Sequence, residues 1–195
     1  MTINIGLLDE ESAVEAIEFV DELAQENGIE WALVGGLAMA LYGSDRTTKD
    51  IDIIADKLLP LEKVGDLVQG GERYLIKTNK KEVAVDWIIR KDVFKQLFAE
   101  ALKESVKIND VPVLTPEWLV VLKFIAGRFK DQEDAVFLLS RNGLVNRNLI
   151  KEHIIENAGE IAWELAKHGY QRWFDLADGR TREEQRNEKE GYIDS

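Results

Sequence analysis

Two aspartates, Asp50 and Asp52, stand one residue apart in the apolar segment DIDIIA. Side chains of a β-strand alternate between its faces, so residues two apart share a face and these carboxylates would lie side by side. Adjacent acidic groups repel each other, and burying either one without a partner would be costly. The pair therefore indicates a cation site, and we expect a metal ion. The alternative is an edge strand that turns a polar face to solvent.

A third carboxylate and several phosphate-compatible residues extend this hypothesis. Asp86 stands alone in the apolar segment VAVDWII, which predicts a second acid-bearing strand. Gly35-Gly36 closes another apolar run and opens a helix, an arrangement that lets backbone N–H groups approach a phosphate. Arg46 and Lys49 precede the two acids and could balance phosphate charge. Together these features predict Mg²⁺–nucleotide chemistry, because Mg²⁺ is bound through carboxylates and substrate phosphates.

The segments that must position these residues show strand and helix patterns in turn. The polar residues 79–81 separate two apolar runs and predict a hairpin. Thr115 followed by Pro116 is typical of a helix start, and the chain after it reads as helical. We expect strands over residues 29–34, 50–55, 72–78, 83–89, 106–108 and 111–114, and helices over residues 9–27, 37–42, 58–69, 93–102, 117–129, 132–141, 147–157 and 160–177.

Composition narrows the classes of function. The chain has 195 residues, no cysteine and a formal net charge of −12. Thiol chemistry, disulfides and zinc–thiolate sites are therefore excluded, and non-specific adhesion to nucleic acid or anionic membrane is disfavoured. The two histidines, His153 and His168, lie among ordinary helical residues and are expected to be structural. The sequence shows neither a signal peptide nor an apolar run of roughly 18 residues, so we expect a cytoplasmic protein without a membrane partner.

The order of Gly35-Gly36, Asp50-Ile51-Asp52 and Val85-Asp86-Trp87 resembles the DNA polymerase β-like nucleotidyltransferase superfamily. Within it, LVGGLAMALYG followed by R-x-T-x-D-x-D is most similar to the AbiEii-type and minimal nucleotidyltransferases. The later segment TPEWLVVLKFIAGRFKDQEDAVFLL also resembles that group. The resemblance covers roughly residues 28–140.

This resemblance implies an α+β fold, with a nucleotidyltransferase-like mixed β-sheet flanked by helices and a helical C-terminal part. The domains would be an αβ core over residues 1–114, helices packed on it over residues 115–178, and a charged tail over residues 179–195. The catalytic and metal-binding residues would be Asp50, Asp52 and Asp86, holding one or two Mg²⁺ ions. Nucleotide-binding residues would be Gly35, Gly36, Arg46, Thr48 and Lys123, with Lys49, Asp131 and Asp134 as further candidates.

The implied activity is transfer of a nucleoside monophosphate from a nucleoside triphosphate to an acceptor, with release of pyrophosphate. The acceptor could be tRNA, a protein, or a small molecule such as a lincosamide or aminoglycoside antibiotic. The family likeness also implies a toxin–antitoxin or defence setting, with a homo-oligomer or a toxin or antitoxin partner. The alternatives are a non-catalytic module that keeps the fold to bind a nucleotide or a partner, and a structural acidic protein whose acids are scattered.

Three further residues have simpler explanations that stay open at this point. Lys123 could be a surface lysine whose aliphatic chain covers a helix face while its ammonium stays in water. Asp131 and Asp134 could be the acidic first turn of a helix, where the helix dipole favours negative charge. The aromatic stripe near the C-terminus predicts core packing or a subunit contact, and it consists of Trp163, Leu165, Ala166, Tyr170, Trp173 and Phe174.

Overall fold

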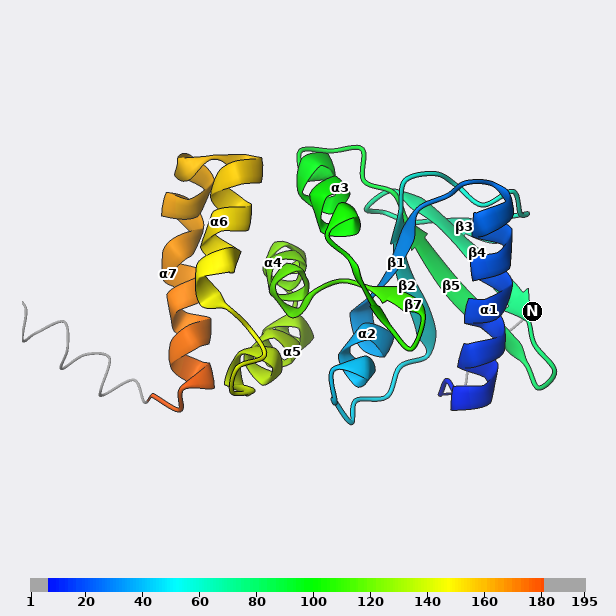
Figure 1. The fold of residues 1–195 in the computed structure, drawn as a ribbon, viewed down its shortest axis with the longest axis horizontal. Helices are drawn as coiled ribbons and strands as arrows, with labels where there is room; N and C mark the ends of the chain where they lie inside the picture. The colour runs from blue at the N-terminus through cyan, green and yellow to red at the C-terminus, as the bar shows by residue number, and fades with distance from the viewer. Residues whose placement is uncertain (1–6, 181–195) are drawn as a thin grey trace, which may run out of the picture. The chain divides into compact units, whose positions relative to one another are not determined.

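The computed structural model describes residues 7–180, and Figure 1 shows their helices and strands. The chain divides into two compact units between Thr115 and Pro116. The first unit contains the sheet, and the second is helical. The charged tail expected from residue 179 lies, from residue 181 onward, outside the described residues. Within residues 7–180, no helix combines the length and apolar character that crossing a bilayer requires.

Seven strands of the described residues form one mixed sheet, in the order β3-β4-β5-β2-β1-β7-β6. The acid-bearing strands are both interior, because β2 lies between β5 and β1 while β5 lies between β4 and β2. The mixed sheet and its helices confirm the α+β fold class. The strands are β1 (Trp31–Val34), β2 (Asp50–Ala55), β3 (Gly65–Asp66), β4 (Gly71–Lys77), β5 (Glu82–Ile88), β6 (Val106–Ile108) and β7 (Val111–Val113).

One helix covers one face of this sheet. Asp21 of this helix accepts a hydrogen bond from Trp31 Nε1 at 3.1 Å, and the Trp31 ring contacts Trp87 at a centroid separation of 6.5 Å. Asp9 caps the start of the same helix by accepting the backbone N–H of Ser12 at 3.0 Å. Figure 1 shows this helix, α1, running in front of the sheet. The helices of the first unit are α1 (Glu10–Glu26), α2 (Gly35–Leu41) and α3 (Lys95–Lys103).

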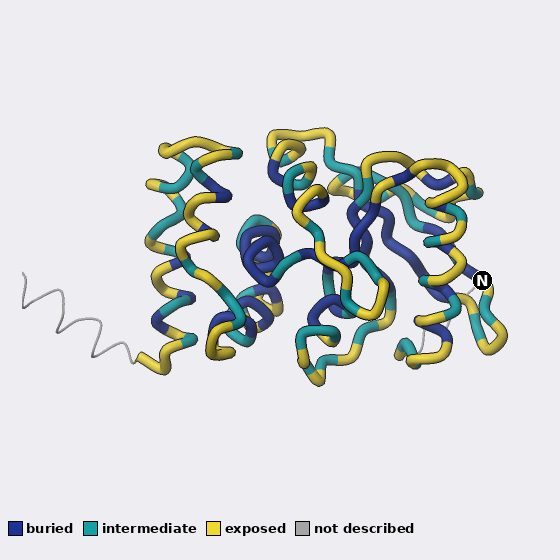
Figure 2. Tube along the Cα trace, viewed as in Figure 1, coloured by how far each residue is buried: buried dark blue, intermediate teal, exposed yellow. Residues whose placement is uncertain are grey.

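The face toward α1 is apolar, and the opposite face carries the acids. Ile53 of β2 pairs with Trp87 of β5, and both are fully buried on the α1 side. Asp52 and Asp86 are the neighbouring residues in the two strands and therefore project to the other face. Figure 2 shows the buried strands at the centre of this unit. Alternation within β2 and β5 thus separates the core from the acidic face.

The helix predicted over residues 58–69 is wrong. Within that segment Gly65–Asp66 forms β3, which pairs antiparallel with β4, and the remainder is turn and coil. Its apolar residues do not share one buried face, since Leu59 is buried while Val64 and Val68 are exposed. Most helical stability in proteins comes from packing an apolar face, so the segment lacks what would hold a helix together.

Residues 116–180 form four helices around an aromatic core. Phe124 stacks on Tyr170 with ring centroids 4.0 Å apart, and Trp118 stacks on His153 at 4.1 Å. His153 is therefore a packing residue, as predicted. Burial in the same core raises the pKa of the Tyr170 phenol. The aromatic stripe contributes Tyr170 and Trp173 to the core, whereas Leu165 is exposed. The helices are α4 (Pro116–Ala126), α5 (Phe129–Ser140), α6 (Arg147–Ala158) and α7 (Glu160–Ala177).

Candidate functional site

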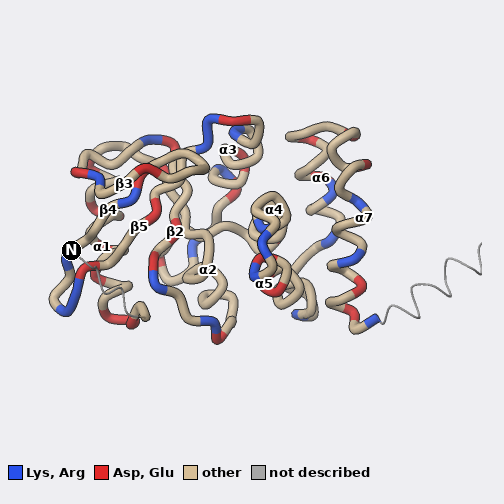
Figure 3. Tube along the Cα trace, turned by 180° about the vertical axis from the view of Figure 1, so that it is seen from behind, with Lys and Arg blue, Asp and Glu red and all other residues tan. Residues whose placement is uncertain are grey.

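The register of two parallel strands brings the three predicted acids together. Asp52 of β2 lies directly opposite Asp86 of β5, and Asp50 lies two residues before Asp52 on the same face. Figure 3 shows acidic positions in red on both strands. The structural alternatives are wrong on this point, because β2 is not an edge strand and these acids are not scattered.

An arginine from the neighbouring strand lies among these carboxylates. Arg73 of β4 is the register partner of Asp86, and its guanidinium forms a two-pronged pair with that carboxylate. Nε donates to Oδ1 at 2.5 Å and Nη2 donates to Oδ2 at 2.8 Å. The same Nη2 lies 3.6 Å from Asp50 Oδ2. One nitrogen therefore joins both carboxylates, and their oxygens can be no farther apart than the sum of those two distances.

Charge and burial explain why this pair is strong. The Asp86 side chain is only 10% exposed, whereas that of Arg73 is 38% exposed. The hydrogen bonds with Asp86 raise the pKa of the Arg73 guanidinium, and the charges of Asp86, Asp50 and Asp52 raise it further, while burial opposes them. Arg73 therefore stays a cation. Bidentate, charge-assisted hydrogen bonds of this kind are among the strongest in proteins.

The carboxylate set fits a cation by its chemistry. Carboxylate oxygens are the ligands that Mg²⁺ takes from proteins, and Asp50, Asp52 and Asp86 already converge on a positive group. Of the three, Asp86 is hydrogen-bonded to that guanidinium and Asp50 Oδ2 lies 3.6 Å from its Nη2. Among residues 7–180, no group of three or more histidine or acidic side chains is arranged to hold a metal ion. That Asp50, Asp52 and Asp86 hold Mg²⁺ stays a prediction.

The two glycines leave room for side chains of the site. Gly35 has a φ of +63°, and a Cβ added there would lie 1.9 Å from Asp52 Oδ2. A Cβ on Gly36 would lie 2.8 Å from Thr48 Cβ. The absence of side chains at Gly35 and Gly36 thus allows Asp52 and Thr48 to pack against the start of α2. A role in holding nucleotide phosphates stays a prediction.

Thr48 positions one of the acids. Its Oγ1 donates to the backbone oxygen of Asp50 at 3.1 Å, with the Asp50 carboxylate Oδ1 also in reach at 3.2 Å. The hydroxyl therefore fixes the start of β2 and orients the Asp50 side chain. Nucleotide binding by Thr48, which the family resemblance implies, stays a prediction.

Removing this hydroxyl is expected to loosen Asp50. Thr48→Val keeps the shape that packs on Gly36 but cannot donate, so we expect a loss of about 1 kcal/mol in the free energy of unfolding and weaker Mg²⁺–ATP binding. Urea denaturation and calorimetric titration measure the two effects. Thr47→Val, at the exposed neighbouring position, is the matched control and should change neither. Equal behaviour of both variants would contradict a positioning role for Thr48.

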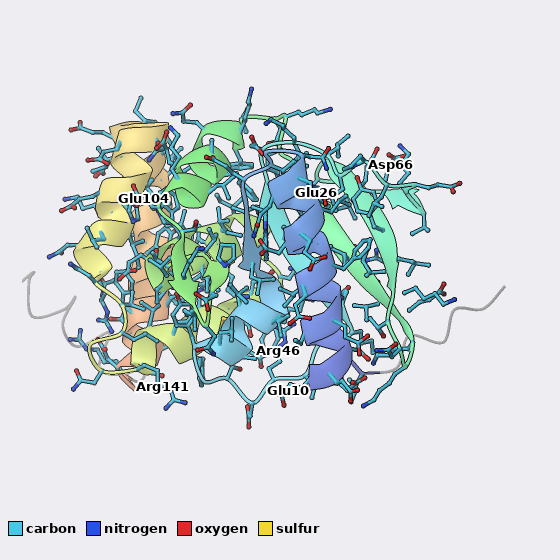
Figure 4. All side chains as sticks on the ribbon, turned by 45° about the vertical axis from the view of Figure 1, so that its right-hand side comes forward. Glu10, Glu26, Arg46, Asp66, Glu104 and Arg141 are labelled. Atoms are coloured by element: carbon cyan, nitrogen blue, oxygen red, sulfur yellow. The ribbon has the colours of Figure 1, made fainter. Side chains whose placement is uncertain are left out.

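The predicted cations of the first unit lie in the loop before β2. Arg46 is half-buried, and its backbone N–H donates to Ser44 Oγ at 3.3 Å. Lys49 is exposed. Figure 4 shows Arg46 on the loop that follows α2. Their pairing with phosphate stays a prediction.

The remaining candidates belong to the second unit, where they form a buried ionic cluster. Lys123 is 6% exposed, and its Nζ donates to Asp134 Oδ2 at 2.5 Å and lies 3.9 Å from Asp131 Oδ1. The explanation of Lys123 as a surface lysine is therefore wrong. Asp131 also accepts hydrogen bonds from the backbone and side chain of Arg128 at the start of α5, so the helix-terminus explanation fits Asp131. It does not fit Asp134, which is buried against Lys123.

Sequence reasoning missed Arg73, although a signal was present. The hairpin was predicted with nearly its observed arms, and its register pairs Lys77 with Glu82 and hence Arg73 with Asp86. An arginine in one arm opposite an acid in the apolar part of the other is the cross-strand pattern of an ion pair. Counting back from the turn would have found it.

Comparisons with known proteins find similar structures but no similar sequences. No protein-family model matches the sequence, and no curated protein matches it. The structure is similar to that of an antigenic nucleotidyltransferase-like protein from Paracoccidioides brasiliensis, with a TM-score of 0.49, 14% identity, and coverage of 80% of this chain and 93% of that one. It is also similar to the solution structure of the antibiotic-resistance factor ANT(2'')-Ia, with a TM-score of 0.39, 13% identity, and coverage of 88% and 97%.

Proposed function

We propose that this protein is a nucleotidyltransferase that transfers a nucleoside monophosphate from a Mg²⁺-bound nucleoside triphosphate to an acceptor hydroxyl. The observation that carries the proposal is the strand register that sets Asp52 beside Asp86, with Asp50 on the same face. The glycine turn packed against Asp52 supports it, because two parts of the motif that resembles nucleotidyltransferases, Gly35-Gly36 and Asp50-Ile51-Asp52, lie side by side in the structure.

The side chains have distinct roles in this reaction. The acceptor oxygen forms a new bond to the α-phosphorus while the bond from that phosphorus to the bridging oxygen breaks, and pyrophosphate leaves with the electron pair. Asp50 and Asp52 would hold the metal that binds the triphosphate, and Asp86 would complete this metal site and take the proton of the acceptor hydroxyl. Bound Mg²⁺ supplies neutralisation of the phosphate charge.

A second candidate is a non-catalytic nucleotide-binding module with the same fold. The observation that favours it is the Arg73–Asp86 pair, which already neutralises the carboxylate expected to serve as base. In that case the acidic face would bind a nucleotide through its cations and glycine turn without transferring it.

Transfer of an α-phosphate label separates the two candidates. Wild-type protein is incubated with Mg²⁺, a cell extract as acceptor source, and each of the four nucleoside triphosphates labelled at the α-phosphate. We expect label to enter an acceptor, and Asp50→Asn or Asp52→Asn to slow this by roughly a hundredfold or more, because each removes a metal-binding oxygen. Asp66→Asn, at an exposed position labelled in Figure 4, is the matched control and should transfer normally.

The outcomes assign the function. Binding of Mg²⁺–nucleotide in calorimetry without transfer would favour the non-catalytic module, and absence of both would reject nucleotide chemistry at this face. A parallel incubation uses triphosphates labelled at the γ-phosphate, and transfer of that label alone would indicate a kinase instead. Sensitivity of the labelled product to ribonuclease or protease, or to neither, would then identify the acceptor as RNA, protein or small molecule.

A further inference from the structure

The cation among the three carboxylates is part of the protein itself. Arg73 binds both oxygens of Asp86 and reaches Asp50 with the same guanidinium. The Asp86 side chain is nearly buried, so its negative charge needs a partner whenever no metal is present. Arg73 supplies that partner from a strand one step away in the sheet.

A metal ion and this guanidinium need the same oxygens. Mg²⁺ demands ligand distances near 2.1 Å in a nearly octahedral arrangement, and a guanidinium on both oxygens of Asp86 occupies one lone pair of each and restricts how the carboxylate can turn toward the metal. Two cations between Asp86 and Asp50 would also repel each other. Arg73 on Asp86 therefore opposes metal binding to all three acids, and its departure favours that binding.

The partial exposure of Arg73 gives it a place to move. Its side chain is 38% exposed, so the guanidinium can turn toward solvent while Asp86 remains in the sheet. A guanidinium is well matched to two phosphate oxygens, and a triphosphate arriving with the metal would offer them. Release from Asp86 and capture of phosphate would then be one exchange of partners.

We propose that Arg73 is an internal counter-ion of the acidic site, which competes with the metal for Asp86 and transfers to the nucleotide phosphates when metal and nucleotide bind together. The inference rests on the proposed function for its second half, which names the nucleotide. It makes metal and nucleotide binding cooperative, because metal alone must displace the arginine while metal with nucleotide gives it a new partner.

The neighbouring residue of the same strand supplies a matched control. Glu72 precedes Arg73 and points to the opposite face, where it pairs with Lys63 at 3.1 Å and accepts a hydrogen bond from Tyr74 Oη at 2.7 Å. Lys63→Gln and Arg73→Gln therefore remove the same charge from pairs carried by adjacent residues on opposite faces of the sheet. Only the second change touches the three acids.

The test measures binding of Mn²⁺, a paramagnetic substitute for Mg²⁺, by electron paramagnetic resonance with and without ATP. Arg73→Gln should bind Mn²⁺ alone roughly tenfold more tightly than wild type, and Mn²⁺–ATP roughly tenfold more weakly. Arg73→Lys keeps the charge without the two parallel hydrogen bonds and should fall between the two in both measurements. Lys63→Gln should match wild type. Circular dichroism verifies folding, and if Arg73→Gln does not fold, Arg73→Lys carries the comparison.

If the Arg73–Asp86 pair were merely structural, Arg73→Gln would not shift the affinities for Mn²⁺ alone and for Mn²⁺–ATP in opposite directions. Equal or weaker binding of Mn²⁺ alone by Arg73→Gln overturns the inference, and so does absence of binding in every variant. Binding by Arg73→Gln without binding by wild type upholds it. The label-transfer assay tests the proposed function independently. If no label is transferred but Arg73→Gln binds Mn²⁺ more tightly than wild type, the proposed function is rejected and the competition between Arg73 and the metal for Asp86 is upheld.

Discussion

Gly35→Ala is expected to lower the free energy of unfolding of the first unit by roughly 2–5 kcal/mol. The backbone of Gly35 is left-handed, which costs any residue with a Cβ, and the new methyl group would overlap the Asp52 carboxylate at 1.9 Å. Asp52 cannot move away freely, because its backbone is paired with β1 on one side and β5 on the other. The same change should therefore abolish metal binding by displacing one of the three acids.

A second glycine separates the two contributions. Gly28 has a φ of +58°, close to that of Gly35, but a Cβ added there would meet no atom within 4 Å. Gly28→Ala should show only the backbone cost, roughly 1–2 kcal/mol, and normal Mn²⁺ binding. Urea denaturation and Mn²⁺ titration of both variants measure the difference. If Gly35→Ala were no worse than Gly28→Ala, Asp52 would not be packed against the glycine turn in solution.

Lys123→Met is expected to destabilise the second unit by roughly 3–5 kcal/mol. The change keeps the apolar length of the side chain but removes the ammonium that pairs with the buried Asp134. A carboxylate that loses its ammonium partner in the interior is costly, because burial disfavours its charged form. Hydrogen exchange followed by mass spectrometry localises the loss, which should appear in α4 and α5.

Two comparisons make this prediction specific. Adding Asp134→Leu to Lys123→Met should recover most of the loss, because an apolar pair can replace a buried ion pair at little cost. Lys167→Met removes a partly exposed lysine that pairs with Glu164 on α7 and should change stability by less than about 0.5 kcal/mol. A small effect of Lys123→Met, similar to that of Lys167→Met, would show that its ammonium is hydrated in solution.

Strand patterns carried most of what could be predicted about the fold. Asp50 and Asp52 alternate with buried isoleucines in β2, so period-two alternation predicted that strand and the face shared by its two acids. β5 was predicted from the apolar run that Asp86 interrupts. The hairpin of β4 and β5 followed from its polar turn. That β2 and β5 are direct neighbours is a long-range fact, and it entered only through the family resemblance.

What sequence reasoning missed depends on contacts between distant residues. Segment 58–69 has helical residue types, but pairing of Gly65–Asp66 with β4 overrides that local preference. Lys123 and Asp134 lie on different helices, so their buried ion pair could not be predicted from the helical pattern of either segment. Gly35 was predicted to hold phosphate, which stays a prediction. The sequence did not show that a side chain at this position would overlap the Asp52 carboxylate.

The order of the strands has a consequence for how the acidic face opens. β2 pairs with β5 over residues 50–54 and with β1 over residues 52–55, so the amides of its central residues should exchange only when the first unit unfolds. β4 is different, because its outer side pairs with only the two residues of β3. Arg73 is one of the two β4 residues in that pairing, and its backbone oxygen also accepts the Val64 N–H at 2.8 Å. The arginine therefore changes partners by turning its side chain, while its own strand and the strands of the carboxylates stay paired.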